Sequence, residues 1–209
     1  MQYSISVHPL LAVLRSHFSQ RAKYTVTQIL TRSHLSKMSK MEMLIAPYKN
    51  TMFLSSMQEE REELEKELFN ITTTSWEKKL TEWQSQYVTF KADYLLRIAL
   101  THPSALGHRK DTGRMSNRAF ETLGDSVLGF LTMSDLFQRI GDALEGDLTN
   151  HKMQLVNNDA LSNVCTEIGL SELILGLDVQ HTKLGKQTVL AGAVEAVLGA
   201  LFVDQVHTF

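Results

Sequence analysis

The chain has 209 residues, of which 43% are hydrophobic and 21% charged, a composition that is typical of a globular protein and excludes overall disorder. Its length allows one domain of ordinary size plus an extension, and no uncharged apolar run approaches the roughly 20 residues of a membrane span, so no membrane partner is predicted. A net charge of −2 gives no overall signature of nucleic-acid binding.

The average charge hides a basic amino-terminal segment. Residues 1–41 contain no Asp or Glu, are rich in Ser and Thr, and carry these basic residues: Arg15, Arg21, Lys23, Arg32, Lys37 and Lys40. This composition is typical of a mitochondrial transit peptide and predicts a location in the mitochondrial matrix. The alternative is a basic extension that contacts RNA phosphates.

Residues 42–88 are predicted to form a charged helical extension. Residues 57–69 have oppositely charged pairs at i,i+4 spacing and a narrow apolar stripe, as expected of a solvated helix. A second amphipathic piece follows, with apolar residues at spacings of four, three and four: Trp76, Leu80, Trp83 and Tyr87. We interpret that stripe as a packing face.

Residues 89–209 are predicted to form an all-α domain with short connections. Helical patterns cover residues 92–100, 117–137, 148–168 and 189–203, and no alternating strand pattern is found. Cys165 has an apolar helical setting that predicts a packed side chain, and one cysteine excludes an intrachain disulfide. Residues 86–209 hold 10 basic and 14 acidic residues, an excess that suits a cation site better than a phosphate-binding surface.

Three carboxylates carry the chemical signal. Glu121 and Asp125 are four residues apart, so on a helix they share one face and could share a hard cation. Glu195 lies in a later apolar helical stretch, and three positions before it Gly192 has no side chain with which to ligate a metal. Carboxylates that converge from two helices can hold divalent ions that activate water against a phosphodiester. We expect the first helix to be substantially buried because of its large apolar residues: Leu123, Val127, Leu128 and Phe130.

Order and spacing of several motifs over about 115 residues resemble the ribonuclease III family. The matching stretches are LLRIALTHPS at 95–104, NRAFETLGDSVL at 117–128, EGDLT at 145–149, and then 174–176 and 190–204. The resemblance implies an all-helical endonuclease-domain fold that dimerises, binds double-stranded RNA across the dimer and cleaves it with Mg²⁺. It also implies that Glu121, Asp125 and Glu195 are metal ligands and catalytic carboxylates.

The sequence departs from the family at several positions. Gly192 stands where the family has an aspartate ligand, Arg118 and Ala119 stand where it has a Glu-Arg pair, and Thr122 replaces a phenylalanine of the dimer interface. Arg118 lies three residues before Glu121, so its charge could replace a cation by pairing with the acids. No double-stranded-RNA-binding domain is expected after the helical domain.

Other polar residues receive simpler interpretations. His102 and Ser104 are predicted to end a helix and satisfy nearby backbone groups. Lys152 could contact RNA or neutralise Asp147. Local RNA contacts are also expected from a basic cluster: Arg109, Lys110 and Arg114.

These observations favour a noncatalytic ribonuclease III-like RNA-binding protein of a mitochondrial ribonucleoprotein, in particular the large ribosomal subunit or its assembly. The partners would be RNA, mitochondrial ribosomal or RNA-processing proteins, and a ribonuclease III-like chain, either a second copy or a different one. One alternative is an active Mg²⁺-dependent mitochondrial endonuclease, with water in the space that Gly192 vacates. Another is an inactive subunit of an RNA-processing or editing complex.

Overall fold

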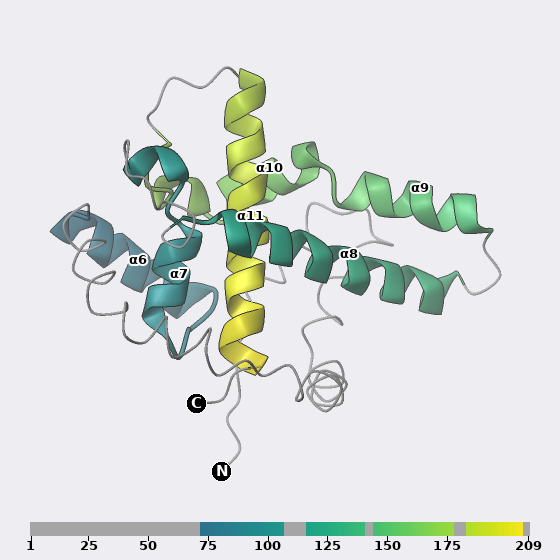
Figure 1. The fold of residues 1–209 in the computed structure, drawn as a ribbon, viewed down its shortest axis with the longest axis horizontal. Helices are drawn as coiled ribbons and strands as arrows, with labels where there is room; N and C mark the ends of the chain where they lie inside the picture. The colour runs from purple at the N-terminus through teal and green to yellow at the C-terminus, as the bar shows by residue number, and fades with distance from the viewer. Residues whose placement is uncertain (1–71, 107–115, 141–143, 178–182, 207–209) are drawn as a thin grey trace, which may run out of the picture.

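The computed structural model describes residues 72–106, 116–140, 144–177 and 183–206, and all regular structure within them is helical (Figure 1). The α-helices are α6 (Thr74–Gln86), α7 (Asp93–Ala99), α8 (Arg118–Arg139), α9 (Glu145–Leu155), α10 (Asn158–Glu167) and α11 (Lys183–Val206), with short 3₁₀ turns η3 (Pro103–Leu106) and η4 (Leu170–Glu172). The predicted all-α class is confirmed. Residues 1–41 and the helix predicted at 57–69 lie outside the described part.

Helix α11 is the centre of the fold, and α8, α10 and α7 all pack against it (Figure 1). Its buried face is built largely from alanine and glycine, which lets neighbouring helices approach closely: Ala191, Gly192, Ala193, Ala196, Gly199 and Ala200. The window Gly185–Asp204 is long and apolar enough to cross a membrane by length and composition, but 67% of it is buried inside the protein. Such burial is what a central core helix requires.

Helix α6 shares the core of the later helices. Trp76 and Trp83 are buried, and their indole N–H groups donate hydrogen bonds to the carbonyl oxygens of Leu173 (3.0 Å) and Ile168 (2.8 Å). The predicted packing stripe is therefore confirmed. Buried residues of α6 belong to the same hydrophobic cluster as those of α7, α10 and α11.

An ion pair and a helix cap hold α7 in place. Arg97 makes a two-pronged contact with Glu77 of α6, at 2.5 and 2.7 Å, and its guanidinium lies 5.7 Å from the centre of the Trp76 ring. At the other end of α7, the buried carboxylate of Asp204 accepts hydrogen bonds from the backbone N–H groups of Lys91 and Ala92. The last turns of α11 therefore cap the start of α7.

The continuous helix predicted at 148–168 is wrong in one respect, because it is two helices. Asn157 has an extended backbone conformation, and its side-chain oxygen accepts the N–H of Ala160 (2.9 Å), which starts α10. Its amide nitrogen donates to the carbonyl oxygens of Met153 and Gln154 at the end of α9. One asparagine thus ends one helix and caps the next.

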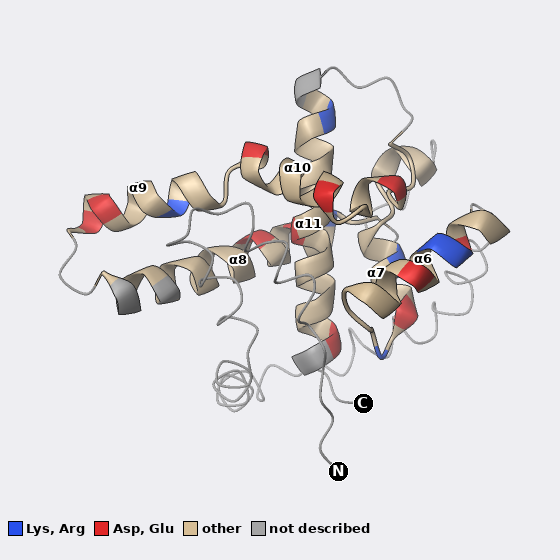
Figure 2. Cartoon of the chain, turned by 180° about the vertical axis from the view of Figure 1, so that it is seen from behind, with Lys and Arg blue, Asp and Glu red and all other residues tan. Residues whose placement is uncertain are grey.

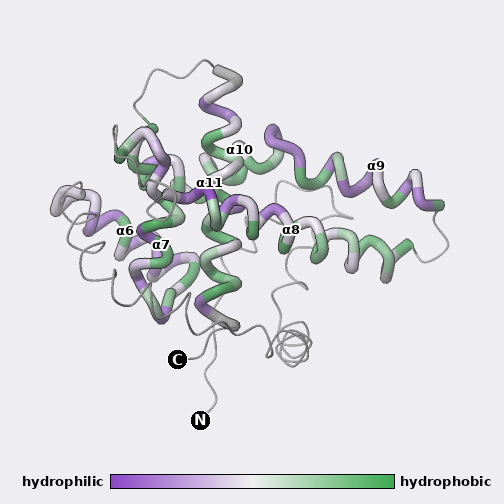
Figure 3. Tube along the Cα trace, viewed as in Figure 1, coloured by the Kyte–Doolittle hydropathy of each residue, from purple (hydrophilic) through white to green (hydrophobic). Residues whose placement is uncertain are grey.

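The far half of α8 and all of α9 form an arm that extends from the packed body (Figures 1 and 3). No residue of α9 is buried. The large exposed hydrophobic residues among those described all lie on this arm or at its tip: Phe130 (60%), Phe137 (63%), Leu144 (76%) and Met153 (64%). The expected burial of α8 therefore holds for Leu128 and fails for Phe130, whose side chain is not covered by the described elements.

Candidate functional site

The site lies where α8 crosses α11, and glycines make the crossing possible. A Cβ atom at Gly124 would overlap the carbonyl oxygen of Glu195, and one at Gly199 would overlap the carbonyl oxygen of Phe120. The two backbones are therefore in direct contact. This contact sets the carboxylates of α8 against Glu195 of α11, and Figure 2 shows acidic residues of α8 at the end that meets α11.

Glu121 fills the room beside Gly192. A Cβ atom at Gly192 would lie 2.9 Å from Cδ and 2.9 Å from Oε1 of Glu121. A carboxylate therefore lies in the space where the sequence interpretation allowed a water. Arg118, one turn earlier on α8, reaches Oε2 of Glu121 at 3.5 Å, so the predicted pairing is present as a single long contact. Charge-assisted hydrogen bonds are usually about 2.7–2.9 Å long.

The pKa of Glu195 is affected by the acidic residues on the other side of the crossing. Its pKa is raised to about 7, first because the carboxyl is partly buried, and then because Asp125 and Glu121 carry like charge nearby. The structure therefore brings the three predicted carboxylates into one electrostatic group. A proton or a cation at this position would relieve their mutual repulsion.

As a donor set for one ion, the same group is incomplete. Among the described His, Cys, Asp and Glu side chains, no three lie close enough together to hold a metal ion between them. Asp125 is exposed, Glu121 is turned to Gly192, and Gly192 supplies no ligand atom. The side chains as placed fit a divalent cation poorly, although all three lie within electrostatic reach of each other.

One predicted RNA-contacting residue lies in the described structure beside this site. Lys152 of α9 lies across α8 at Gly129, one turn after Asp125, and its Nζ would be 3.0 Å from a Cβ there. Of the two roles left open for Lys152, the ion pair with Asp147 is not found among the described residues. The other basic residues predicted to contact RNA lie outside the described part of the chain: Arg109, Lys110 and Arg114.

The remaining sequence candidates have structural roles, as predicted. Ser104 donates its hydroxyl to the carbonyl oxygen of Gly176 (2.9 Å), and its backbone N–H donates to Nδ1 of His102 (3.2 Å). Cys165 is buried, and burial raises the pKa of its thiol to about 12, so it is an inert core residue. Sequence reasoning missed Gly124 and Gly199, although the seven-residue spacing of Gly192 and Gly199 on one helix was a usable signal.

A model of the ribonuclease III domain family matches residues 118–206, which contain the whole α8–α11 crossing. The crystal structure of the nuclease domain of ribonuclease III from Campylobacter jejuni is 31% identical to this chain. The match covers 82% of that domain and 61% of this chain, with a TM-score of 0.50. The chain belongs to the ribonuclease III family.

Bacterial members of the ribonuclease III family are similar to this chain in sequence. Ribonuclease 3 from Coxiella burnetii (strain Dugway) is 42% identical over 113 residues, and ribonuclease 3 from Nitrosomonas europaea is 40% identical over 118 residues. These matches cover 53% and 56% of this chain but 45% of each relative. The chain thus spans less than half of the length of these relatives, and the similarity identifies the domain.

Proposed function

We propose that this chain is a noncatalytic ribonuclease III-like protein that binds RNA and serves a structural role in a mitochondrial ribonucleoprotein, in particular the large ribosomal subunit or its assembly. The observation that carries the proposal is the place of Glu121. Its carboxylate occupies the room beside Gly192, where the family resemblance implies an aspartate ligand, and Arg118 supplies a positive charge from the protein itself.

The missing ligand at Gly192 and the positive charge of Arg118 both disfavour metal binding. Mg²⁺ requires near-octahedral coordination by oxygen atoms and gives up its water reluctantly. Here the side chains that would hold it are Glu121, Asp125 and Glu195, and they do not converge on one point as placed. An RNA surface does not need that convergence, because phosphate groups are bound by basic side chains such as Lys152.

The first experiment separates binding from cleavage. The purified full chain is mixed with labelled duplex RNA, with and without Mg²⁺ or Mn²⁺, and both the gel shift and the product length are followed. We expect a salt-sensitive shift and intact RNA under both conditions. Metal-dependent cleavage that disappears in Glu195→Gln and persists in the matched exposed variant Glu172→Gln would overturn the noncatalytic proposal.

A second experiment tests the position of Glu121 directly. In Gly192→Asp, the new side chain must displace the Glu121 carboxylate, and four carboxyl groups then face the crossing. We expect Mn²⁺ affinity, measured by titration calorimetry, to rise about tenfold, in the range seen when a metal site gains supporting groups. Gly192→Ala displaces Glu121 without adding a ligand and is the control. Equal affinities in the two variants would mean that other departures have dismantled the site.

One observation favours a second candidate, an active Mg²⁺-dependent endonuclease that processes RNA precursors in mitochondria. The pKa of Glu195 is raised first by burial and then by the like charges of Asp125 and Glu121, so part of the shift is repulsion among the three carboxylates. A divalent cation would relieve that repulsion, and when bound it would supply an activated water and stabilise the leaving oxygen. The cleavage experiment decides between the two candidates. An inactive subunit of an RNA-processing complex is distinguished by sedimentation apart from large ribosomal subunits.

We also propose that the α8–α9 arm contacts a ribonuclease III-like partner chain. Four large apolar side chains exposed on one arm are a liability in water and are typical of a protein interface. Light scattering of the purified chain distinguishes a homodimer from a monomer, and a monomer would indicate that the partner is a different chain. Loss of the dimer in Phe137→Ser, with no change in Lys78→Ser on α6, would assign the interface to the arm.

The mitochondrial matrix location rests on the composition of residues 1–41. We expect a fluorescent fusion of the full chain to accumulate in mitochondria. Replacing the six basic residues of this segment by glutamine should leave the fusion in the cytosol. Unchanged import would transfer the function of the segment from targeting to RNA contact.

A further inference from the structure

One stripe of α8, called the open stripe here, lies toward solvent along most of the helix. Its residues recur at spacings of three, four, four, three and four, which places all of them on one side: Ala119, Thr122, Ser126, Phe130, Met133 and Phe137. Met133 is half-buried, and the other five are exposed. Phe120 and Gly124, which meet α11, lie on the opposite side of the helix.

The open stripe divides into two halves that differ in size. The half near the α8–α11 crossing has small side chains: Ala119, Thr122 and Ser126. The half in the arm, the more hydrophobic one in Figure 3, has large side chains: Phe130, Met133 and Phe137. The hydroxyls of Thr122 and Ser126 each donate to the carbonyl oxygen four residues earlier on α8, at 3.1 Å. An apolar partner that covers the small half therefore leaves neither hydroxyl proton without an acceptor.

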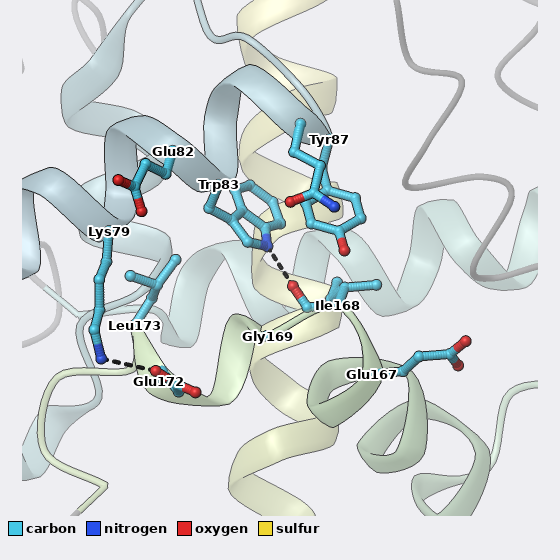
Figure 4. A pocket seen from close by; sticks show the side chains of 10 residues that line it. Lys79, Glu82, Trp83, Tyr87, Glu167, Ile168, Gly169, Glu172 and Leu173 are labelled. Atoms are coloured by element: carbon cyan, nitrogen blue, oxygen red, sulfur yellow. Dashed lines mark hydrogen bonds and ion pairs between the residues drawn. The ribbon is translucent and has the colours of Figure 1, made fainter.

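The groove between α6 and η4 differs from the open stripe, because its side chains already have partners within the chain. Lys79 and Glu172 form an ion pair at 2.7 Å, and the rings of Trp83 and Tyr87 that line the groove are buried (Figure 4). Among the described residues, the large exposed hydrophobic side chains lie on the arm or at its tip. The arm is therefore the surface on which a partner would bury apolar area.

We propose that the open stripe binds the open stripe of a second copy of this chain, with the two α8 helices antiparallel. A two-fold axis then sets the large half of each helix against the small half of the other, in these opposite pairs: Phe137 with Ala119, Met133 with Thr122, and Phe130 with Ser126. A parallel pair would set large side chains against each other at one end and leave a gap at the other, which close packing disfavours. The inference rests on the proposed arm contact and names its partner.

Charges beside the open stripe favour the same arrangement. Asp125 and Gly129 lie one turn apart on one flank of the stripe, Asp125 is exposed, and the ammonium group of Lys152 lies at Gly129. The antiparallel pair brings Asp125 of each copy close to Gly129 of the other, so opposite charges approach each other twice across the axis. A parallel pair would set Asp125 against Asp125.

Exchanging the sizes of one opposite pair tests the antiparallel register. Ser126→Phe sets an aromatic ring against Phe130 of the other copy, and Phe130→Ser leaves two small side chains opposite each other. Each single variant should weaken the dimer by about a hundredfold, because symmetry changes two contacts and each is expected to contribute about tenfold. The double variant Ser126→Phe/Phe130→Ser again has one large and one small residue at each contact and should recover most of the affinity. Sedimentation equilibrium of the full chain gives the dissociation constants.

The other outcomes separate this inference from the proposals on which it rests. Ser85→Phe, at an exposed position of α6, is the control and should leave the dissociation constant unchanged. Stronger association in Ser126→Phe, or a double variant as weak as the single ones, would overturn the antiparallel register. A chain that stays monomeric would overturn the second copy as partner and leave the arm to a different chain. A dimer that Phe137→Ser does not weaken would overturn the arm contact itself, and RNA cleavage separately decides the noncatalytic proposal.

Discussion

Two junctions between helices each contain a glutamate and an arginine, and they are built in opposite ways. At the α6–α7 junction, Glu77 and Arg97 meet at 2.5 and 2.7 Å, and side chains hold the helices together. At the α8–α11 crossing, the backbones touch, and Arg118 reaches Glu121 at 3.5 Å while remaining 61% exposed. Arg97 is only 19% exposed and has a second carboxylate, Asp93, beside it. An ion pair is tight where packing has already limited the freedom of both side chains.

The two junctions also shift the pKa of a glutamate in opposite directions. The pKa of Glu77 is lowered, chiefly by its hydrogen bond with Arg97, so this carboxylate is stable in its charged form. Arg118 makes one long, exposed contact with Glu121, and the pKa of Glu195 is raised, first by burial and then by the like charges of Asp125 and Glu121. One junction is complete as it stands, while the other still favours a proton, a cation or a basic partner.

The largest effect is expected from breaking the backbone contact. Gly124→Ala would place a methyl group on the carbonyl oxygen of Glu195, and backbone atoms cannot rotate away as a side chain can. We expect a loss of about 3 kcal/mol in the free energy of unfolding, at the upper end of overpacking costs, measured by urea denaturation. Gly146→Ala on α9 meets no atom within 4 Å and should be neutral or stabilising. Equal stability of the two variants would contradict the direct backbone contact between α8 and α11 at Gly124.

The next effect is expected at the α6–α7 junction. Arg97→Ala leaves Glu77 half-buried without its cation and should cost about 2 kcal/mol, less than for a fully buried pair because both partners retain some contact with water. Arg97→Lys should recover less than half of this loss, since an ammonium group cannot span both carboxylate oxygens. Full recovery in the lysine variant would mean that charge alone holds the junction.

The pH dependence of stability should have opposite signs at the two junctions. Because the pKa of Glu77 is lowered, its contribution is present above its ordinary pKa and is lost as the pH falls through the lowered value. Because the pKa of Glu195 is raised to about 7, the folded state holds a proton that the unfolded state has released, and stability falls as the pH rises from about 4.5 to 7. Solvent screening limits this second effect to the order of 1 kcal/mol.

Two variants separate these pH effects. Glu195→Gln should remove the decline between pH 4.5 and 7, whereas Arg97→Ala should remove the loss in acid and leave the decline near neutrality unchanged. Unfolding curves in urea across this pH range give the measurement. A decline that persists in Glu195→Gln would assign it to another group.

The smallest effect is expected at Arg118. Arg118→Ala removes one long, exposed contact and should change the free energy of unfolding by no more than about 0.5 kcal/mol. Its effect on RNA should be clearer, since loss of this charge makes the crossing more negative and should weaken duplex binding at low salt. A stability loss equal to that of Arg97→Ala would contradict the comparison of the two junctions.

The sequence was sufficient for the helical class, the Glu121–Asp125 pair and the tryptophan stripe, because each depends on local spacing, whereas Glu195 was joined to the pair through the family resemblance. Glu121 and Asp125 share a face wherever they lie on a helix, and Trp76, Leu80 and Trp83 define one apolar stripe. The place of Glu121 against Gly192 could not be predicted, because it depends on the depth at which two backbones cross. Phe130 was expected to be buried because its apolar character says nothing about whether a neighbouring element covers it.

The cap that Asp204 provides to α7 has a consequence for how the protein is made. The backbone groups of Lys91 and Ala92 precede their acceptor by 113 and 112 residues, and the indoles of Trp76 and Trp83 precede theirs by 97 and 85. At the usual pace of about 5–20 residues per second, α6 and α7 leave the ribosome several seconds before their partners exist. During that interval the apolar faces of α6 and α7 lack the partners that bury them in the folded protein.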